Sequence, residues 1–189
     1  MIDRDGSRRD FLRSTVGRVA REVTIRTERR VVTERYHRPP GARPEIEFLA
    51  ACTRCGKCTE VCPPAAIRPL APRAGFAAGT PAIDALVQPC TVCPDMPCAA
   101  VCPTDALIVP EGGWDGLRMT QLELVPETCI AFHGVQCGVC ARACPVGADA
   151  IVLDAEGRPV LRAEGCVGCG VCVRACVTSP RSLTLHFTE

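Results

Sequence analysis

Cysteine dominates the chemistry available to this chain. The sequence has 16 cysteines among 189 residues, far above average usage. They fall into four groups of four with none left over, spanning residues 52–62, 90–102, 129–144 and 166–176. The groups are Cys52, Cys55, Cys58 and Cys62; Cys90, Cys93, Cys98 and Cys102; Cys129, Cys137, Cys140 and Cys144; and Cys166, Cys169, Cys172 and Cys176.

The spacing within the groups is typical of iron–sulfur proteins. The first and last groups have the C-x2-C-x2-C-x3-C spacing of bacterial ferredoxins, whereas the second widens one gap to x4 and the third opens its first gap to x7. The first three groups end in Cys-Pro, and the fourth has Val177 after its last cysteine. A cubane cluster has four iron corners, each of which needs one thiolate. The sixteen cysteines therefore predict four [4Fe-4S] clusters.

The fourth cysteine of each group is expected to serve a neighbouring cluster. A C-x2-C-x2-C loop supplies three thiolates to one cluster, and the fourth, carried on a helix, points to another. The groups should therefore work in pairs, and two pairings stay open: consecutive, or first with fourth and second with third. Glycines lie between the ligands at positions where a positive φ lets the backbone approach the sulfides: Gly56, Gly138, Gly168 and Gly170.

Two other uses of cysteine fit this spacing poorly. Disulfide-rich secreted domains do not repeat C-x2-C-x2-C-x3-C-P, and adjacent triplets are too crowded for so many bridges. Structural zinc sites prefer two separated C-x2-C pairs over compact quartets.

A repeated supersecondary unit surrounds each group. Similar apolar segments follow the four groups at residues 65–67, 105–108, 149–152 and 182–185. Each unit is expected to be a ligand loop, a short helix that ends near the last cysteine, and then a strand. Residues 150–153 and 159–161, around Glu156-Gly157, predict a hairpin. The predicted fold is α+β: two ferredoxin-like 2[4Fe-4S] modules with short helices and small β-hairpins.

The composition makes metal binding part of folding. The chain has only five Phe, one Trp and one Tyr, so a core of large side chains would be thin. Cluster binding would supply the missing stability, and the apo-protein is expected to be largely unfolded.

Charge divides the chain into a basic tail, residues 1–43, and an acidic four-cluster domain, residues 44–189. The tail carries twelve Arg against six acidic residues, whereas the domain carries ten basic against fifteen acidic residues. Ser7 to Arg13 match the twin-arginine export motif, yet charged residues interrupt every apolar run that a signal peptide would need.

The tail also carries an apolar stripe, formed by Leu12, Val16, Val19 and Val23 at helical spacing. It predicts a basic amphipathic helix whose residues 8–30 make peripheral contact with an anionic membrane or dock on an acidic partner. A solvated, partly disordered tail is the alternative.

With these motifs in place, residues 38–185 resemble the NapG/MauM-type ferredoxins. The resemblance includes the order of the x4 and x7 gaps. It also includes Arg38-Pro-Pro-Gly-Ala leading to Glu45 and Phe48, Gly79-Thr-Pro, the first ligand loop from Cys52 to Cys58, and the second-group segment from Pro89 to Ala99.

The resemblance implies an electron carrier. Members are similar to subunits that accept electrons from a membrane quinol-oxidising ferredoxin-type partner and pass them to a soluble cytochrome or reductase. The alternative function is an iron–sulfur subunit of another membrane-associated oxidoreductase complex. The resemblance implies a periplasmic location at a membrane, while the missing apolar signal region leaves the cytoplasmic face open.

No enzymatic activity is expected of the chain itself. No G-x-G-x-x-G follows a strand, there is no P-loop, and no cysteine group lacks a ligand that would leave an iron open. Nothing in the sequence indicates nucleic-acid binding. His37, His133 and His186 are predicted to be surface residues, and Trp114 is predicted to anchor a loop.

Overall fold

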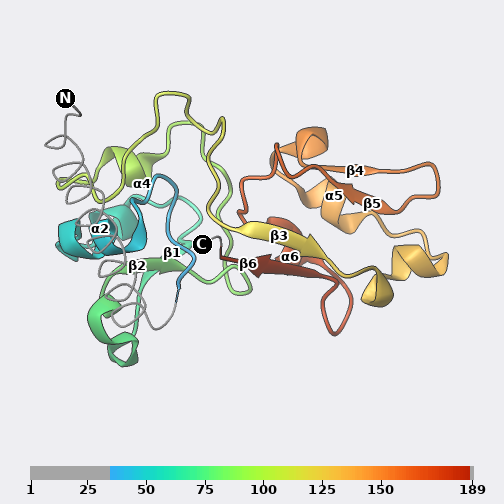
Figure 1. The fold of residues 1–189 in the computed structure, drawn as a ribbon, viewed down its shortest axis with the longest axis horizontal. Coiled ribbons are helices and arrows are strands. Elements are labelled where there is room, and N and C mark those ends of the chain that lie inside the picture. Colours follow the sequence, from blue (N-terminus) through green and yellow to red (C-terminus); the bar gives the residue numbers. More distant parts are fainter. Residues whose placement is uncertain (1–34, 188–189) are drawn as a thin grey trace, which may run out of the picture. The chain divides into compact units, whose positions relative to one another are not determined.

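The computed structural model describes residues 35–187, and the twin-arginine-like motif and residues 8–30 of the tail lie outside them. Within this range the helices are short; the longest α-helix, α2, has seven residues. No described helix is long and apolar enough to cross a bilayer. The elements, drawn in Figure 1, are α2 (Glu45–Ala51), α3 (Lys57–Glu60), β1 (Ile67–Pro69), η1 (Pro72–Ala77), β2 (Pro81–Ile83), α4 (Pro97–Ala100), β3 (Gln121–Leu124), η2 (Pro126–Thr128), η3 (Ile130–His133), α5 (Val139–Ala143), η4 (Gly147–Asp149), β4 (Ile151–Leu153), β5 (Pro159–Leu161), α6 (Val171–Ala175) and β6 (Leu183–His186).

The strands form three two-stranded antiparallel sheets, so the fold is α+β. β1 pairs with β2, with Ile67 opposite Ile83. β4 and β5 form the predicted hairpin, with Ile151 opposite Leu161, and this prediction is confirmed. β3 and β6 lie side by side, so the segment before the third cysteine group pairs with the segment after the fourth (Figure 1).

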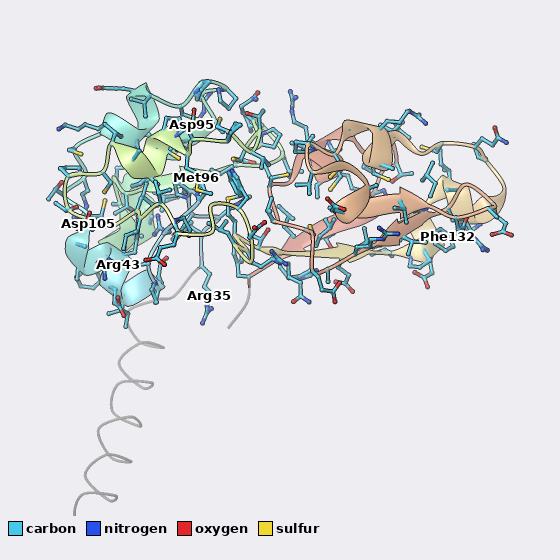
Figure 2. The ribbon with its side chains drawn as sticks, turned by 90° about the horizontal axis from the view of Figure 1, so that it is seen from above. Arg35, Arg43, Asp95, Met96, Asp105 and Phe132 are labelled. Carbon is cyan, nitrogen blue, oxygen red and sulfur yellow. The ribbon has the colours of Figure 1, made fainter. Side chains whose placement is uncertain are left out.

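Strands follow the first, third and fourth cysteine groups as predicted, but not the second. Residues 105–108 form only an isolated bridge, between Leu107 and Ala42. The ladder stays short because the facing segment contains Pro39, Pro40 and Pro44, which have no N–H to donate. Arg43 supplements the bridge, because its Nε donates to the Asp105 carbonyl at 2.6 Å; both residues are labelled in Figure 2.

A buried arginine holds the segment before α2. The Arg38 guanidinium forms a double hydrogen bond with the Glu45 carboxylate, at 2.6 and 3.0 Å, and also donates to Thr80 Oγ1 and the Pro81 carbonyl. Its charge lies 4.6 Å from the centre of the Phe48 ring, which is fully buried. These contacts form one structural unit that joins α2 to β2. We call it the Arg38 unit; it consists of Arg38, Glu45, Phe48, Thr80 and Pro81.

Three small clusters of buried side chains replace a single large core. One packs Phe48 and Met96 with Leu107 around α2 and α4. Another packs Ile151 and Leu183 with Val173 around α5 and α6. The third, between them, combines Ile67 and Ile83 with residues of the second and fourth cysteine groups: Cys90, Cys98, Val167 and Cys169. Cysteines are thus part of the core, as expected of a protein built around metal sites.

The segment before β3 ties the fourth ligand loop to the rest of the domain. The Met119 N–H donates to the Val167 carbonyl at 3.0 Å, and Thr120 Oγ1 donates to the Gly168 carbonyl at 2.8 Å. Thr120 is only 1% exposed, so water does not compete for this bond.

The Arg38 unit makes a prediction with a matched control, because Glu45 and Glu47 lie in the same first turn of α2. Replacing Glu45 by Ala leaves the buried Arg38 charge without its partner and should lower the free energy of unfolding by about 3 kcal/mol. Glu47→Ala breaks only an exposed 3.5 Å pair with Arg43 and should change it by less than about 1 kcal/mol. Denaturant titration of the iron-loaded protein, followed by visible absorbance, measures both. Equal losses would contradict a structural role for the Arg38 unit.

Candidate iron–sulfur sites

The thiols of the first loop share a cavity with the last cysteine of the second group. This cavity, site I, is lined by Cys52, Cys55, Cys58 and Cys102. The first three lie in the loop that enters α3, and Cys102 follows α4. The negative charge on Cys102 contributes to raising the pKa of Cys58, after burial and the Cys52 and Cys55 charges.

The second loop forms the reciprocal arrangement. Site II is lined by Cys90, Cys93, Cys98 and Cys62, the last cysteine of the first group. The Ala66 N–H donates to Cys62 Sγ at 3.3 Å, so the start of β1 orients this thiol. Trp114 lines the same cavity, and its Nε1 donates to the Cys93 carbonyl at 2.9 Å. The predicted loop anchor is confirmed, and its place beside site II is new.

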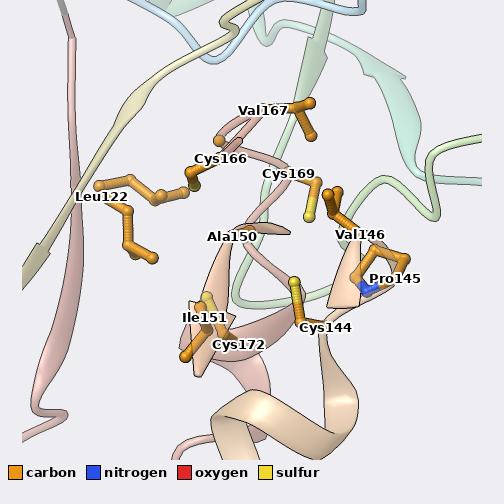
Figure 3. Close-up of a pocket in the computed structure, with 13 residues that line it drawn as sticks. Leu122, Cys144, Pro145, Val146, Ala150, Ile151, Cys166, Val167, Cys169 and Cys172 are labelled. Carbon is orange, nitrogen blue, oxygen red and sulfur yellow. The ribbon is translucent and has the colours of Figure 1, made fainter. Parts of the chain in front are cut away.

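The fourth loop repeats the pattern. Site IV is lined by Cys166, Cys169, Cys172 and Cys144, the last cysteine of the third group (Figure 3). Its walls are apolar and come from Leu122 and from the turn before β4. Figure 3 shows the Cys144 and Cys169 side chains directed into the cavity.

The third loop gathers the remaining thiols, which we call site III. Cys129 and Cys137 contribute to raising the pKa of Cys140 through their charge, after burial, so these three lie close together. The x7 gap is filled by η3, which carries Phe132 (Figure 2). Cys176, at the end of α6, is the one thiol not yet assigned, and α6 packs against α5.

The thiols therefore gather by consecutive groups, first with second and third with fourth. In both pairs the helices that follow the ligand loops pack on each other, α3 with α4 and α5 with α6. Each helix spans only four or five residues, so the cysteine after it reaches the neighbouring site.

All four of these helices begin at a residue in the left-handed conformation. The residues are Gly56, Met96, Gly138 and Gly170, with φ of 80°, 40°, 63° and 84°. The predicted need for positive φ at the glycines, Gly168 included, is confirmed. Met96 was not predictable from residue type, because a buried methionine rarely adopts this conformation.

Burial makes the inner thiols costly to ionise. It raises the pKa of Cys90 and Cys98 to about 11 and that of Cys169 to about 12, and nearby cysteine charges add to the effect. The pKa of Cys172 is raised further for the same reasons. Iron ligation requires thiolates, so a bound cationic group would offset this cost at sites II and IV.

Hydrogen bonds lower the pKa of two cysteines that end their groups, Cys102 and Cys176. Burial alone would raise the pKa of Cys102, but donors from Leu107, Thr104 and Ala106 outweigh it and lower the pKa. Burial is likewise outweighed at Cys176, by hydrogen bonds from the Thr178 hydroxyl and from the backbone of Thr178 and Ser182. Thiolates are therefore favoured at both positions.

The arrangement fits a group with several metal corners. Among residues 35–187 no three His, Cys, Asp or Glu side chains converge on one point as ligands of a single ion. At sites I, II and IV four thiols instead surround a cavity, as the corners of a cubane require.

One histidine departs from the prediction. His133 and His186 are exposed as expected, but His37 is only 5% exposed, so the predicted surface position is wrong. Burial lowers the pKa of His37 to about 4, which makes the ring neutral. It is buried because its segment packs on β2, where the Ile83 N–H donates to the His37 carbonyl at 2.7 Å.

Comparison with known proteins agrees with this chemistry. A family model described as a 4Fe-4S dicluster domain matches residues 134–179, and one described as a 4Fe-4S binding domain matches residues 49–72. No solved structure matches the chain significantly.

Two similar proteins carry ferredoxin-type names. The chain is 39% identical to the Ferredoxin-type protein NapG of Escherichia coli over 142 residues, which is 69% of this chain and 62% of that protein. It is 40% identical to the Methylamine utilization ferredoxin-type protein MauM of Paracoccus denitrificans over 145 residues, 72% of this chain and 65% of that protein. The chain thus spans less than two thirds of either relative, and the resemblance to the NapG/MauM-type ferredoxins is confirmed.

The helix starts supply a second matched prediction. A Cβ at Gly170 would lie 2.4 Å from the Ala85 Cβ, whereas a Cβ at Gly56 would have nothing within 4 Å. Both residues have nearly the same φ, so Gly170→Ala and Gly56→Ala carry the same left-handed strain of about 1–2 kcal/mol. Only Gly170→Ala also forces the start of α6 away from the segment around Ala85. We expect faster cluster loss in denaturant for Gly170→Ala than for Gly56→Ala; identical rates would contradict this close approach.

Proposed function

We propose that this ferredoxin-type iron–sulfur electron-transfer protein, a homologue of NapG and MauM, relays electrons through four [4Fe-4S] clusters in the order site I, site II, site IV, site III. All sixteen cysteines act as ligands in this proposal, with Cys176 as the fourth ligand of site III. Each pair of sites forms a ferredoxin-like 2[4Fe-4S] module. The chain supplies no catalytic residue, and catalysis belongs to its partners.

Electrostatic interactions between thiols of successive sites support the order. The Cys58 charge of site I acts on Cys98 of site II, and the Cys140 charge of site III acts on Cys172 of site IV. The observation that carries the proposal is the link between the pairs. Cys90 of site II and Cys169 of site IV lie in one buried cluster, and the Cys90 charge acts on Cys169. This continuity favours a relay over separate structural clusters.

Site I is the proposed point of approach for one redox partner. Its Cys55 is exposed, and Arg54 and Lys57 line the same cavity. Arg54 also donates to the Phe76 carbonyl at 2.9 Å, which fixes a loop on which the Phe76 side chain is 74% exposed. An exposed aromatic beside a basic rim suits docking of an acidic protein surface.

By resemblance, the partners are a membrane quinol-oxidising ferredoxin-type subunit on one side and a cytochrome or reductase on the other. We further propose that the protein works at a membrane, with the basic residues 8–30 as its peripheral contact.

The relay requires a definite metal content. Protein purified without oxygen should hold about 16 iron and about 16 sulfide per chain, because each cysteine quartet fits one cubane. Chemical analysis measures both. A fully reconstituted sample that saturates near half of this content, or that fills with zinc, would rule out four clusters.

The crossed ligands make a sharper test. Cys102→Ala should remove the cluster of site I, although Cys102 belongs to the second group, and Cys62→Ala should remove that of site II. EPR of the reduced protein distinguishes the two, because loss of site II should also remove the magnetic interaction that broadens the site I signal. If Cys102→Ala removed the same cluster as Cys93→Ala, the crossed assignment would be wrong.

Membrane contact is tested by deletion. The tail is basic and the domain acidic, and an oxidised cluster with four thiolates adds about two negative charges, so the domain should be repelled by anionic lipid. Removing residues 1–34 should release the protein from vesicles and leave its iron content unchanged. Val16→Asp with Val19→Asp should weaken binding by breaking the apolar stripe. Recovery from cells of a mature protein without this segment would instead favour export.

A further inference from the structure

The residue two positions after the fourth cysteine differs between the sites. Thr104 and Thr178 follow Cys102 and Cys176, whereas Pro64 and Val146 occupy the same position after Cys62 and Cys144. Thr178 Oγ1 lies 3.2 Å from Cys176 Sγ, and Thr104 Oγ1 lies 3.9 Å from Cys102 Sγ. Thr91 Oγ1 also lies 3.8 Å from Cys93 Sγ at site II. Of these three contacts between a hydroxyl and a ligand sulfur, the one at Cys176 is the shortest.

The surroundings of Thr178 set the direction of its hydrogen bonds. Thr178 Oγ1 accepts the Ser182 N–H at 3.1 Å and lies 2.8 Å from Ser182 Oγ. A thiolate that ligates iron has no proton, so in the contact with Cys176 the hydroxyl of Thr178 must be the donor. Because this uses its only proton, the Ser182 hydroxyl must donate to Thr178. The result is a directed chain from Ser182 through Thr178 to Cys176.

Ser182 is itself fixed in place. It is 1% exposed, and its carbonyl accepts the Val125 N–H at 2.8 Å where β3 ends and β6 begins. Neither water nor a change of rotamer readily breaks the chain of hydroxyls, so it is a built feature of the sheet that connects β3 and β6.

We propose that Thr178 is a tuning residue that donates its hydroxyl proton to the Cys176 thiolate and makes site III the most easily reduced of the four sites. This rests on the proposed function. Reduction adds a negative charge, which a donor to the ligand sulfur stabilises. Site IV has no such hydroxyl, and site II has only the longer contact of Thr91 Oγ1 with Cys93 Sγ, at 3.8 Å. Their Cys98 and Cys172 are only 6% and 5% exposed, so burial opposes the added charge there.

The proposal gives the relay a direction. Site III lies at one end of the proposed order, and site I, at the other end, has the longer Thr104 contact and a hydrogen bond from Thr59 to the half-buried Cys58. Electrons that enter at site I would therefore come to rest at site III, which makes site III the outlet toward the acceptor.

Redox titration of the full, iron-loaded chain, monitored by EPR, tests the role of Thr178. Thr178→Val removes the hydroxyl at nearly constant volume. It should lower the highest of the four midpoint reduction potentials by about 59 mV, which is a tenfold change in the equilibrium constant of a one-electron reduction. Cys137→Ala, which removes a site III ligand, assigns that step. Thr178→Ser keeps the donor and should restore the midpoint.

The matched control is Thr184→Val, because Thr184 lies two residues beyond Ser182 and its hydroxyl contacts His186 at 3.0 Å. It should leave all four midpoints unchanged. Ser182→Ala keeps Thr178 but removes the first donor of the chain, so it should lower the same step by less. An unchanged highest step in Thr178→Val or in Ser182→Ala, or an equal fall in Thr178→Ser, would overturn the proposal. An iron content near half of the expected value would instead overturn the proposed function.

Discussion

The structure depends on the number of thiols that one ligand loop can supply. A three-cysteine loop supplies three thiols, and a cubane needs four. The fourth must come from outside the loop, and a helix of only four or five residues carries it to the neighbouring site. Because Cys62 and Cys102 are exchanged in opposite directions, neither site of the pair can be completed without the other. α3 packs on α4, and α5 packs on α6, which is the arrangement that such an exchange requires.

The same exchange explains why so few large side chains suffice. In the two clusters that contain Cys90, Cys98, Cys169 and Cys172, buried thiols take positions that aliphatic side chains would fill in an ordinary core. Burial raises their pKa, so their thiolate forms, which iron ligation requires, are costly in the folded state unless a cationic metal group accompanies them. Arg38 solves a different problem at site I, where one buried charge is matched by a carboxylate and two aromatic rings.

Part of this arrangement could be predicted from local sequence: the loop geometry from the glycines between the cysteines, and the β4–β5 hairpin from the apolar segments around Glu156-Gly157. The pairing of the groups could not, because it depends on which loops the chain brings together, and both pairings satisfy the same spacing. Three other features were not predicted correctly, for identifiable reasons. Met96 adopts a left-handed conformation that its residue type disfavours, and residues 105–108 face prolines that cannot continue a ladder. His37 is buried because of a partner distant in sequence, Ile83. The Arg38 motif was recognised by resemblance, but its physical role required the contacts with Glu45 and Thr80.

The junction between the two pairs explains why the domain is more than two ferredoxins in one chain. Cys62, Cys102 and Cys144 each lie with the neighbouring loop of their own pair, so this exchange does not require the pairs to touch. The contact is made instead by close backbone approach. Gly168 lies so near Thr120 that a Cβ there would fall 2.2 Å from the Thr120 carbonyl oxygen, and Gly170 faces Ala85. The apolar residues Ile67, Ile83 and Val167 then seal the space around Cys90 and Cys169. This buried apolar cluster holds Cys90 and Cys169 together and away from water, at 8% and 6% exposure. The proposed transfer of electrons from one pair to the other depends on this junction.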